Sequence, residues 1–542
     1  MSTPWSPPVE LSPREELLCR KLEKHRRFFR FLRLHRHQLF ADGFEAKLLA
    51  LYSDAPRGTK PKAPAQLLLV VLLQAFTGAS DDDAVQNCET DLRWQLVLDC
   101  LGADKAPFQR TTLVDFRTRL TKADFLSEVL KRTADLARDS GDFDAKKVAK
   151  LRIAIDSLPL QGAGRVEDTL NLLARALRLL VIAISATVLL TPEQIYAEAG
   201  LRILAAKSPK TGLDRDWDQT GAMDSALTDL MNEVESMQRW VRTQHPDLLQ
   251  LRQVHAAQAQ LQKLIVQDTE PCASGGHRII QDTAPNRQMS LFDPEMRHGR
   301  KSKSEQIEGY KVYLAQDLDL DVTRAACVLP ANQAEKDGAD KLAPALKSQG
   351  EVTELHIDRA FMTSQLSLEV SRVDLHAVIC RGRKASKGER FGKSDFRLDF
   401  ETQQATCPAG QKAPIRLVGP KRVATFGAEL CQSCPQRLQC QPEAGRAQRK
   451  IVLLPHEELA QATAKTARTP AGRARLRERV KVEHANARQA RKSGGRARYV
   501  GVAKNDFDAN RIAAANNLQL LDRRWRAAEA PEVAVASVVN RN

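Results

Sequence analysis

The chain has 542 residues, enough for several compact domains with apolar cores of their own. Its 83 Lys and Arg against 67 Asp and Glu give a net charge of +16, which favours a polyanionic partner, either nucleic acid or an anionic membrane. The most apolar runs, residues 67–76 and 179–190, are shorter than the roughly 18 residues of a spanning helix, so we interpret both as buried core helices and expect no membrane partner.

Residues 1–140 are predicted to form a helical N-terminal, DNA-binding domain. The opening MSTPWSPPVELSPREE lacks the basic, apolar and small-residue order of a secretory signal, so we expect a cytoplasmic protein with reduced cysteines. A basic stretch then places Phe28, Phe31 and Leu32 together at helical spacing, with Arg and His on the other side. That charged side is either a solvated face or a DNA contact. Further along, Ser80 is well placed as the N-cap of a helix.

Residues 148–525 mix strand and helix patterns and predict an α/β domain. The segment KLRIAIDSLPL predicts a buried strand that stops at a turn after Asp156, and further strands are predicted at 287–293, 309–320, 323–330 and up to Asp358. We expect a helical insertion at 195–275 and a loop-rich, cysteine-bearing insertion at 389–455. A flexible tail is expected at 526–542.

Three acids stand out by their context. Asp156 and Asp358 lie at predicted strand ends, and Glu483 lies within an arginine-rich helix. They can converge only if the two strands are neighbours and the helix packs on their sheet, and carboxylates so arranged suit Mg²⁺. Each acid also has a plain structural alternative: Asp156 and Asp358 could cap a following helix, and Glu483 could pair with Arg479 on the helix surface.

Four of the ten cysteines cluster late in the chain, at Cys407, Cys431, Cys434 and Cys440. Cys431 and Cys434 have the two-residue gap of a zinc ligand pair, and a loop-rich segment gains folding energy from such an ion. The last gap is five residues, so reduced, unliganded thiols remain the alternative to structural zinc.

Several long blocks resemble the DDE transposases of bacterial insertion sequences, in the branch with a helical N-terminal domain and a cysteine-bearing insert. The blocks are SDDDAVQNCETDLRWQLVLD, FQRTTLVDFRTRL, IAIDSLPLQGAGRVEDTLNLLARAL, DPEMRHGRKSKSEQIEGYK, ELHIDRAF and RERVKVEHANARQARKSGGRARYVG. This resemblance implies a ribonuclease-H-like catalytic core within 148–525, with Asp156, Asp358 and Glu483 as its catalytic acids. The family signature around the glutamate is incomplete, because Leu476 stands at its tyrosine and Ala490 at its lysine, for which Arg491 or Lys492 could substitute.

The resemblance implies an enzyme that cleaves the ends of an insertion sequence and joins them to target DNA. Two Mg²⁺ or Mn²⁺ ions on the three acids would stabilise the attacking and leaving oxygens. The partners would be double-stranded DNA, as terminal repeats and target, and a second copy of the chain in a homodimer, in a bacterial, nucleoid-associated setting. The predicted DNA-binding residues lie in a basic loop and in the basic segment 470–504: Arg300, Lys301, Lys303, Arg479, Arg488, Arg491 and Lys492.

Two other functions stay open at this point. One is a transposase-derived protein without catalytic activity that binds element ends or represses transcription. The other is a ribonuclease-H-like nuclease that cleaves DNA without joining it.

Overall fold

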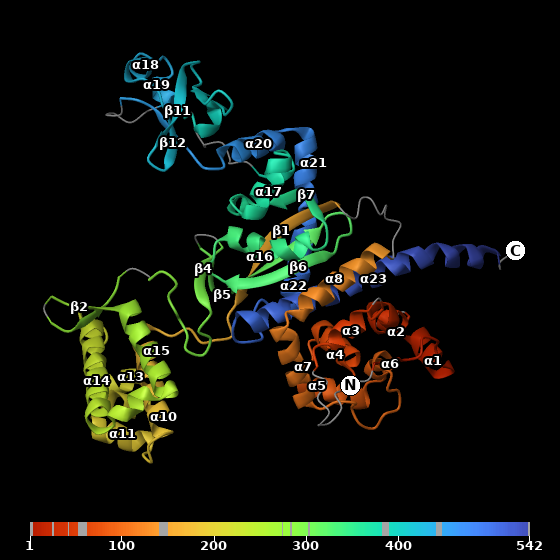
Figure 1. The fold of residues 1–542 in the computed structure, drawn as a ribbon, viewed down its shortest axis with the longest axis horizontal. Coiled ribbons are helices and arrows are strands. Elements are labelled where there is room, and N and C mark those ends of the chain that lie inside the picture. The colour runs from red at the N-terminus through yellow and green to blue at the C-terminus, as the bar shows by residue number, and fades with distance from the viewer. Residues whose placement is uncertain are drawn as a thin grey trace.

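The chain folds around a six-stranded mixed sheet, from which two helical groups and a second, smaller sheet project (Figure 1). This is a computed structural model. It describes residues 4–23, 27–41, 43–52, 62–139, 150–273, 275–281, 284–301, 304–381, 390–440 and 447–539.

The described residues before the central sheet form helices. These are α1 (Pro13–Leu22), α2 (Arg27–Leu39), α3 (Phe44–Leu49), α4 (Pro64–Thr77), α5 (Asp81–Thr90), α6 (Leu92–Leu98), α7 (Arg110–Lys122) and α8 (Phe125–Asp139). Helix α4 carries the first apolar run and is buried almost throughout, which confirms the predicted core helix. Ser80 caps α5 as predicted, in a reciprocal capping box with Asp83.

The central sheet has the order β4-β5-β1-β7-β8, and β6 pairs with β5 on the same side as β4. Strand β1 is antiparallel to β5 and parallel to β7, which is parallel to β8. The strands are β1 (Lys150–Gln161), β4 (Arg297–Arg300), β5 (Gln306–Asp317), β6 (Thr323–Pro330), β7 (Glu351–Ile357) and β8 (Val378–Cys380). No strand forms at 287–293, where one was predicted.

Helices cover both faces of this sheet. On one face, α16 (Glu335–Lys347) and α17 (Gln365–Val373) share an apolar cluster with β1, β6 and β7. On the other, α22 (Val480–Ser493) and α23 (Val502–Val539) pack together with the N-terminal helices. Both faces are therefore buried, as expected for an α/β domain.

Strand β1 does not stop after Asp156, contrary to the prediction. It continues through Pro159 to Gln161, so Asp156 lies inside the strand. The pairing of β1 with β7 ends at Ala154, and beyond that point the strand pairs with β5 on its other side. Beyond Ala154, the side of β1 that faces β7 makes no ladder of hydrogen bonds. Pro159, which has no N–H to donate, is therefore tolerated there as it is on an edge strand.

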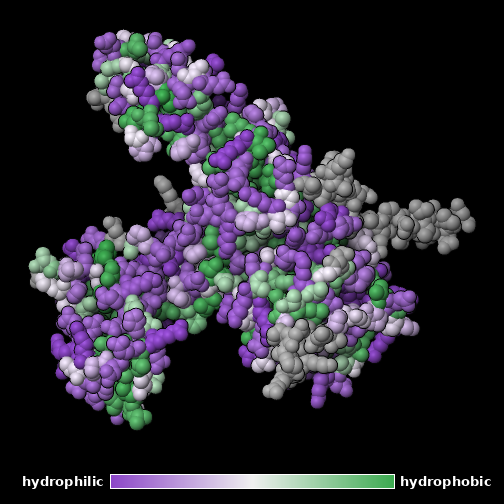
Figure 2. Space-filling model, viewed as in Figure 1, coloured by the Kyte–Doolittle hydropathy of each residue, from purple (hydrophilic) through white to green (hydrophobic). Residues whose placement is uncertain are grey.

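A group of helices follows β1 and starts at Thr169, whereas the sequence predicts a helical insertion at 195–275. Its helices are α10 (Thr169–Ser185), α11 (Pro192–Ala199), α12 (Arg202–Ala205), α13 (Pro209–Leu213), α14 (Ala222–Gln244), η1 (Pro246–Gln250) and α15 (Arg252–Asp268), followed by the short strands β2 (Thr269–Pro271) and β3 (His277–Ile279). Helix α10 belongs here because its apolar side chains enter the core of this group. The second apolar run is only partly a core helix, because α10 ends at Ser185 and the side chains of Ile182 and Leu189 are exposed. Figure 2 shows hydrophobic surface at the tip of this lobe, where Figure 1 labels α10 and α11.

The cysteine-bearing segment, predicted to be loop-rich, contains a five-stranded antiparallel sheet. The elements are η3 (Lys393–Asp395), β9 (Arg397–Asp399), β10 (Gln404–Thr406), β11 (Lys412–Val418), β12 (Lys421–Thr425), α18 (Ala428–Gln432), α19 (Arg437–Cys440) and β13 (Lys450–Leu453). The strands are short and separated by polar turns, so the alternation of apolar and polar residues that predicts a strand is weak in this part of the sequence. Their apolar side chains form a small core of their own.

Two further helices, α20 (Glu457–Arg468) and α21 (Pro470–Glu478), lead from this cysteine module back to the central sheet. The last helix, α23, runs into the segment 526–542 that was predicted to be a flexible tail, through a stretch rich in helix-forming Ala and Arg. Within the described residues no single helix is long and apolar enough to cross a membrane, although α4 and α5, bent by 104°, meet that test as a pair.

Candidate active site

The register of the sheet brings Asp156 and Asp358 side by side. Strands β1 and β7 are parallel, and Ala154 lies opposite His356. Asp156 and Asp358 each follow two residues later, so they lie at the same level where the two strands diverge. The two strands are neighbours, which is the condition under which acids so distant in sequence can converge.

Glu483 reaches the same place from helix α22. This helix packs against β1 and β5, with Val482 and Ala485 buried in the core. Glu483 lies in its first turn, with its side chain 58% exposed on the open side of the helix. The structure therefore gathers the three acids that the sequence singled out.

Arg479 lies at the centre of the three acids. Its Nη2 atom is 2.9 Å from Oδ1 of Asp156, and its Nη1 atom is 2.8 Å from Oδ1 of Asp358. Glu483 is further away, at 3.9 Å from Nη1. The Arg479–Glu483 pair is therefore not the simple surface ion pair that the sequence offered as an alternative, because the guanidinium makes its short contacts with the two aspartates.

The two capping alternatives also fail. Asp156 lies within a strand. Asp358 does stand at the N-cap position of the short helix η2 (Arg359–Phe361), but its side chain makes no capping hydrogen bond. Both carboxylates are turned toward Arg479 instead.

Asn486 completes the contacts of Asp156. Its Nδ2 atom donates to Oδ2 of Asp156 at 3.0 Å. Burial and the nearby carboxylates of Asp358 and Glu483 raise the pKa of Asp156, although Arg479 acts in the opposite direction. Asn486 was missed in the sequence, yet positions 479, 483 and 486 share one helical face, and that spacing was the available signal.

A network of charged side chains joins β1, β7 and α21 next to the three acids. The Glu354 carboxylate on β7 accepts hydrogen bonds from Arg152 of β1 at 3.0 Å and from Arg475 of α21 at 2.8 Å, and lies 2.5 Å from Nε2 of His356. Burial opposes ionisation, but the hydrogen bonds from His356, Arg152 and Arg475 outweigh it and hold the pKa of Glu354 well below its ordinary value. Arg152 also bonds to Glu478 at 2.6 Å, so the network ties α21 to the sheet just before Arg479.

The residues predicted to bind DNA have different surroundings. Arg300 and Lys301 are exposed at the end of β4, while Lys303 lies outside the described residues. On α22, Arg491 is exposed.

Two of the predicted DNA contacts on α22, Arg488 and Lys492, are partly withdrawn from solvent. Arg488 is half-buried, and burial lowers its pKa. Lys492 donates to the backbone oxygen of Phe76 and lies 4.5 Å from the centre of its ring. Lys492 therefore joins α22 to the N-terminal helices, whereas the side chain of Arg491 is exposed.

The four late cysteines surround one small cavity in the cysteine module, beside Phe396 and Phe426. Cys407 follows β10, Cys431 lies on α18, Cys434 in the turn after it and Cys440 at the end of α19. All four are free thiols. Across the described part of the chain, no group of three or more His, Cys, Asp or Glu has the geometry of a metal site, in this module or around Asp156.

Comparison with known proteins gives two matches, both to transposase families. Residues 17–119, in the N-terminal helices, match the family described as Transposase domain (DUF772). Residues 406–521, which include Arg479, Glu483 and Asn486, match the family described as Transposase DDE domain. No curated protein and no solved structure matches the chain. The two matches, in this order along a mixed α/β fold, support a DDE transposase of the insertion-sequence type.

Proposed function

We propose that the protein cleaves DNA at the ends of an insertion sequence and joins those ends to target DNA, with Asp156, Asp358 and Glu483 as its catalytic acids. The observation that carries the proposal is the meeting of these three carboxylates around the single guanidinium of Arg479. Two acids from neighbouring strands and one from a helix have no shared structural task in the sheet, whereas a metal-dependent phosphoryl transfer requires such a group.

The fold supports a ribonuclease-H-like catalytic core. Strands β6, β5 and β1 form an antiparallel meander that continues into the parallel strands β7 and β8, with helices on both faces. On this proposal the domain spans residues 148–525, with the helical group and the cysteine module as insertions. Residues 1–140 would bind DNA.

The acids suit a hard divalent ion such as Mg²⁺ or Mn²⁺, which prefers oxygen ligands. Asp156 and Asp358 already share one cationic partner, so an ion could take the place of the Arg479 guanidinium. When bound, such ions would stabilise the charge on the attacking and leaving oxygens of an in-line displacement. Asn486 would hold the Asp156 carboxylate in orientation, and Arg479, once displaced, would lie free to contact a DNA phosphate.

DNA is the partner that transposase families imply, and the net charge of +16 agrees with it. We further propose a homodimer on DNA, because two element ends must be held together for joining. The four cysteines line one cavity but do not have the geometry of a metal site as they stand, so this proposal includes their closing around a structural Zn²⁺ that their thiolates would hold.

Incubation of the full chain with a labelled element-end duplex and an unlabelled target plasmid, with Mg²⁺, Mn²⁺ or EDTA, tests the function. The proposal predicts metal-dependent cleavage followed by label joined to the plasmid. Cleavage without joined product would support a nuclease. Binding without cleavage would support a repressor.

A further inference from the structure

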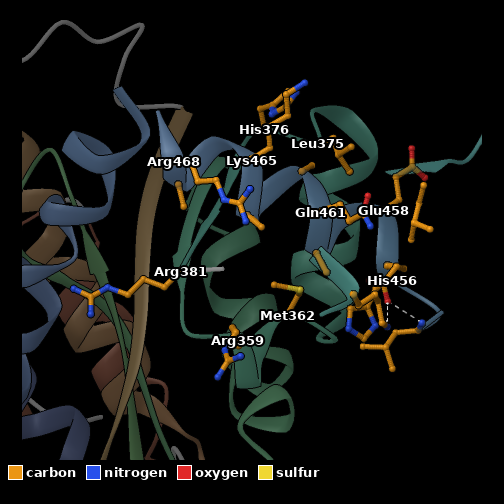
Figure 3. Close-up of a pocket in the computed structure, with 18 of the residues that line it drawn as sticks. Arg359, Met362, Leu375, His376, Arg381, His456, Glu458, Gln461, Lys465 and Arg468 are labelled. Atoms are coloured by element: carbon orange, nitrogen blue, oxygen red, sulfur yellow. Dashed lines mark hydrogen bonds and ion pairs between the residues drawn. The ribbon is translucent and has the colours of Figure 1, made fainter. Parts of the chain in front are cut away.

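A groove lies between the cysteine module and the central domain, and its lining includes the residue that directly follows Asp358 (Figure 3). That residue is Arg359. Arg381 also lines the groove: this residue follows Cys380, and Cys380 pairs with Ile357, the residue before Asp358. The groove therefore borders the ends of β7 and β8 on one side and the cysteine module on the other.

Cations dominate the charged lining of the groove. Arg359, Arg381, Lys465 and Arg468 are exposed, and within the described residues none of them has an acidic partner. Two acids also line it. Glu457 is paired with Lys393 at 2.7 Å, and Glu458 lies with His456 at the end away from Arg381 (Figure 3). The groove is therefore lined by positively charged side chains, from Arg359, next to Asp358 in the sequence, to Arg468.

The other component of the lining is apolar. Phe400 of the cysteine module is half-buried, with Leu398 beneath it, and Met362 and Leu375 line the side formed by the central domain. The groove encloses about 1220 Å³, above the roughly 300–1,000 Å³ of most small-molecule sites. Its size and open shape suit a segment of a polymer.

We propose that this groove binds a single DNA strand, with phosphates on Lys465 and Arg468 and bases against the apolar wall at Phe400, and leads that strand to the acids. The inference rests on the proposed function. A groove that combines cations with apolar and aromatic surface fits unpaired nucleotides, whereas paired bases present no free faces to such a wall. An acidic peptide would be attracted by the cations but would gain little from an aromatic ring.

The test is fluorescence anisotropy of labelled oligothymidine and of a labelled duplex of equal length, with the full chain and no added Mg²⁺ or Mn²⁺, so that no cleavage intervenes. The groove variant is Lys465→Glu with Arg468→Glu. Its control is Lys412→Glu with Arg416→Glu, which makes the same charge change on exposed positions of β11 outside the groove. Phe400→Ala tests the apolar wall at constant charge.

The groove variant is expected to weaken oligothymidine binding about tenfold or more and to reduce the slope of log K against log salt by about 1.4, or about 0.7 for each of two phosphates. The control pair is expected to change binding less than twofold, by about 0.4 kcal/mol or less. Phe400→Ala is expected to weaken oligothymidine binding about fivefold or more and duplex binding less. Equal losses in the two charge pairs, or equal losses for single strand and duplex, would overturn the proposal.

Photocross-linking of the wild-type chain to oligodeoxynucleotides with 5-iodouracil keeps the inference testable if a variant fails to fold. The cross-link is expected in the peptide that contains Phe400, and a cross-link confined to peptides outside the groove contradicts the inference. Displacement of oligothymidine by polyglutamate at equal charge concentration would favour an acidic protein ligand and would also overturn it. Because these readouts need no cleavage, a failure of the proposed enzymatic function is distinguishable from a failure of the groove.

Discussion

The Nη2 atom of Arg479 lies 2.9 Å from Oδ1 of Asp156, between that carboxylate and Asp358. A divalent ion that uses these two aspartates must displace the guanidinium. Replacement of Arg479 by Gln removes the competing cation and is expected to tighten Mn²⁺ binding about tenfold, or about 1.4 kcal/mol, close to the lower end of the roughly 1.5–3 kcal/mol of a charged hydrogen bond. Calorimetric titration of the DNA-free protein measures this change.

In the same titration, Arg479→Lys keeps the charge and serves as the matched control, with binding close to that of the wild type. Equal or weaker Mn²⁺ binding by Arg479→Gln would show that the arginine does not compete with the ion.

The hydrogen bond from Asn486 to Asp156 predicts a loss of cleavage without a loss of DNA binding. Asn486→Ala frees the Asp156 carboxylate to turn, and the loss of such a supporting contact typically lowers activity about 10–100-fold. Single-turnover cleavage measures the effect, with His484→Ala, an exposed position of the same helix, as the control. If Asn486→Ala cleaves DNA as fast as His484→Ala does, the contact has no positioning role.

The charged network at Glu354 predicts a pH-dependent stability. The pKa of Glu354 is depressed, so the folded state gains stability above the ordinary glutamate pKa of about 4.3 and loses it as the pH falls below that value. At neutral pH, Glu354→Gln is expected to cost about 1–2 kcal/mol of unfolding free energy, less than a fully buried pair because Arg152 and Arg475 are partly exposed.

Thermal unfolding at a series of pH values measures this dependence, with Glu351→Gln at the exposed start of β7 as the control. The difference between wild type and Glu354→Gln should shrink as the pH falls below about 4. A difference that stays constant with pH would contradict the electrostatic origin.

The cysteine module predicts bound zinc. Purified protein is expected to contain about one Zn²⁺ per chain, as in a site with four thiolates, and Cys431→Ser is expected to lose it together with part of the thermal stability. Atomic absorption measures the metal, and Cys272→Ser, in the helical insertion, is the control. A zinc-free wild type whose four thiols react freely with a thiol reagent would favour the unliganded alternative.

Part of the site could be predicted from the sequence because its residues lie in strongly patterned segments. Asp358 follows a clear alternation of apolar residues, and Glu483 lies in a long helical pattern. The position of Arg479 between two aspartates could not be predicted, since it depends on how α22 packs across β1 and β5. The sequence predicts Asp156 at a strand end because Pro159 is typical of a strand stop, but the pairing of β1 with β7 has already ended at Ala154 and the strand continues past the proline.

The peripheral parts of the fold were harder to predict. In the cysteine module the strands have three to seven residues, too few to show an alternation above the background of polar turns. The predicted bound at residue 195 differs from the start of the helical group at Thr169, because α10 joins that group through its apolar side chains. In both cases long-range packing, which local periodicity does not report, decides the boundary.

The most direct test of the central claim is the cleavage rate of Asp156→Asn, Asp358→Asn and Glu483→Gln on an element-end duplex with Mg²⁺, each compared with Glu401→Gln, an exposed acid of the cysteine module. Loss of one metal ligand removes several kcal/mol of charge stabilisation, so the cleavage rate of each of the three variants is expected to fall by about a hundredfold or more. Each variant is expected still to bind DNA. Glu401→Gln is expected to cleave at the wild-type rate. Cleavage at the wild-type rate by any of the three would remove that acid from the catalytic centre.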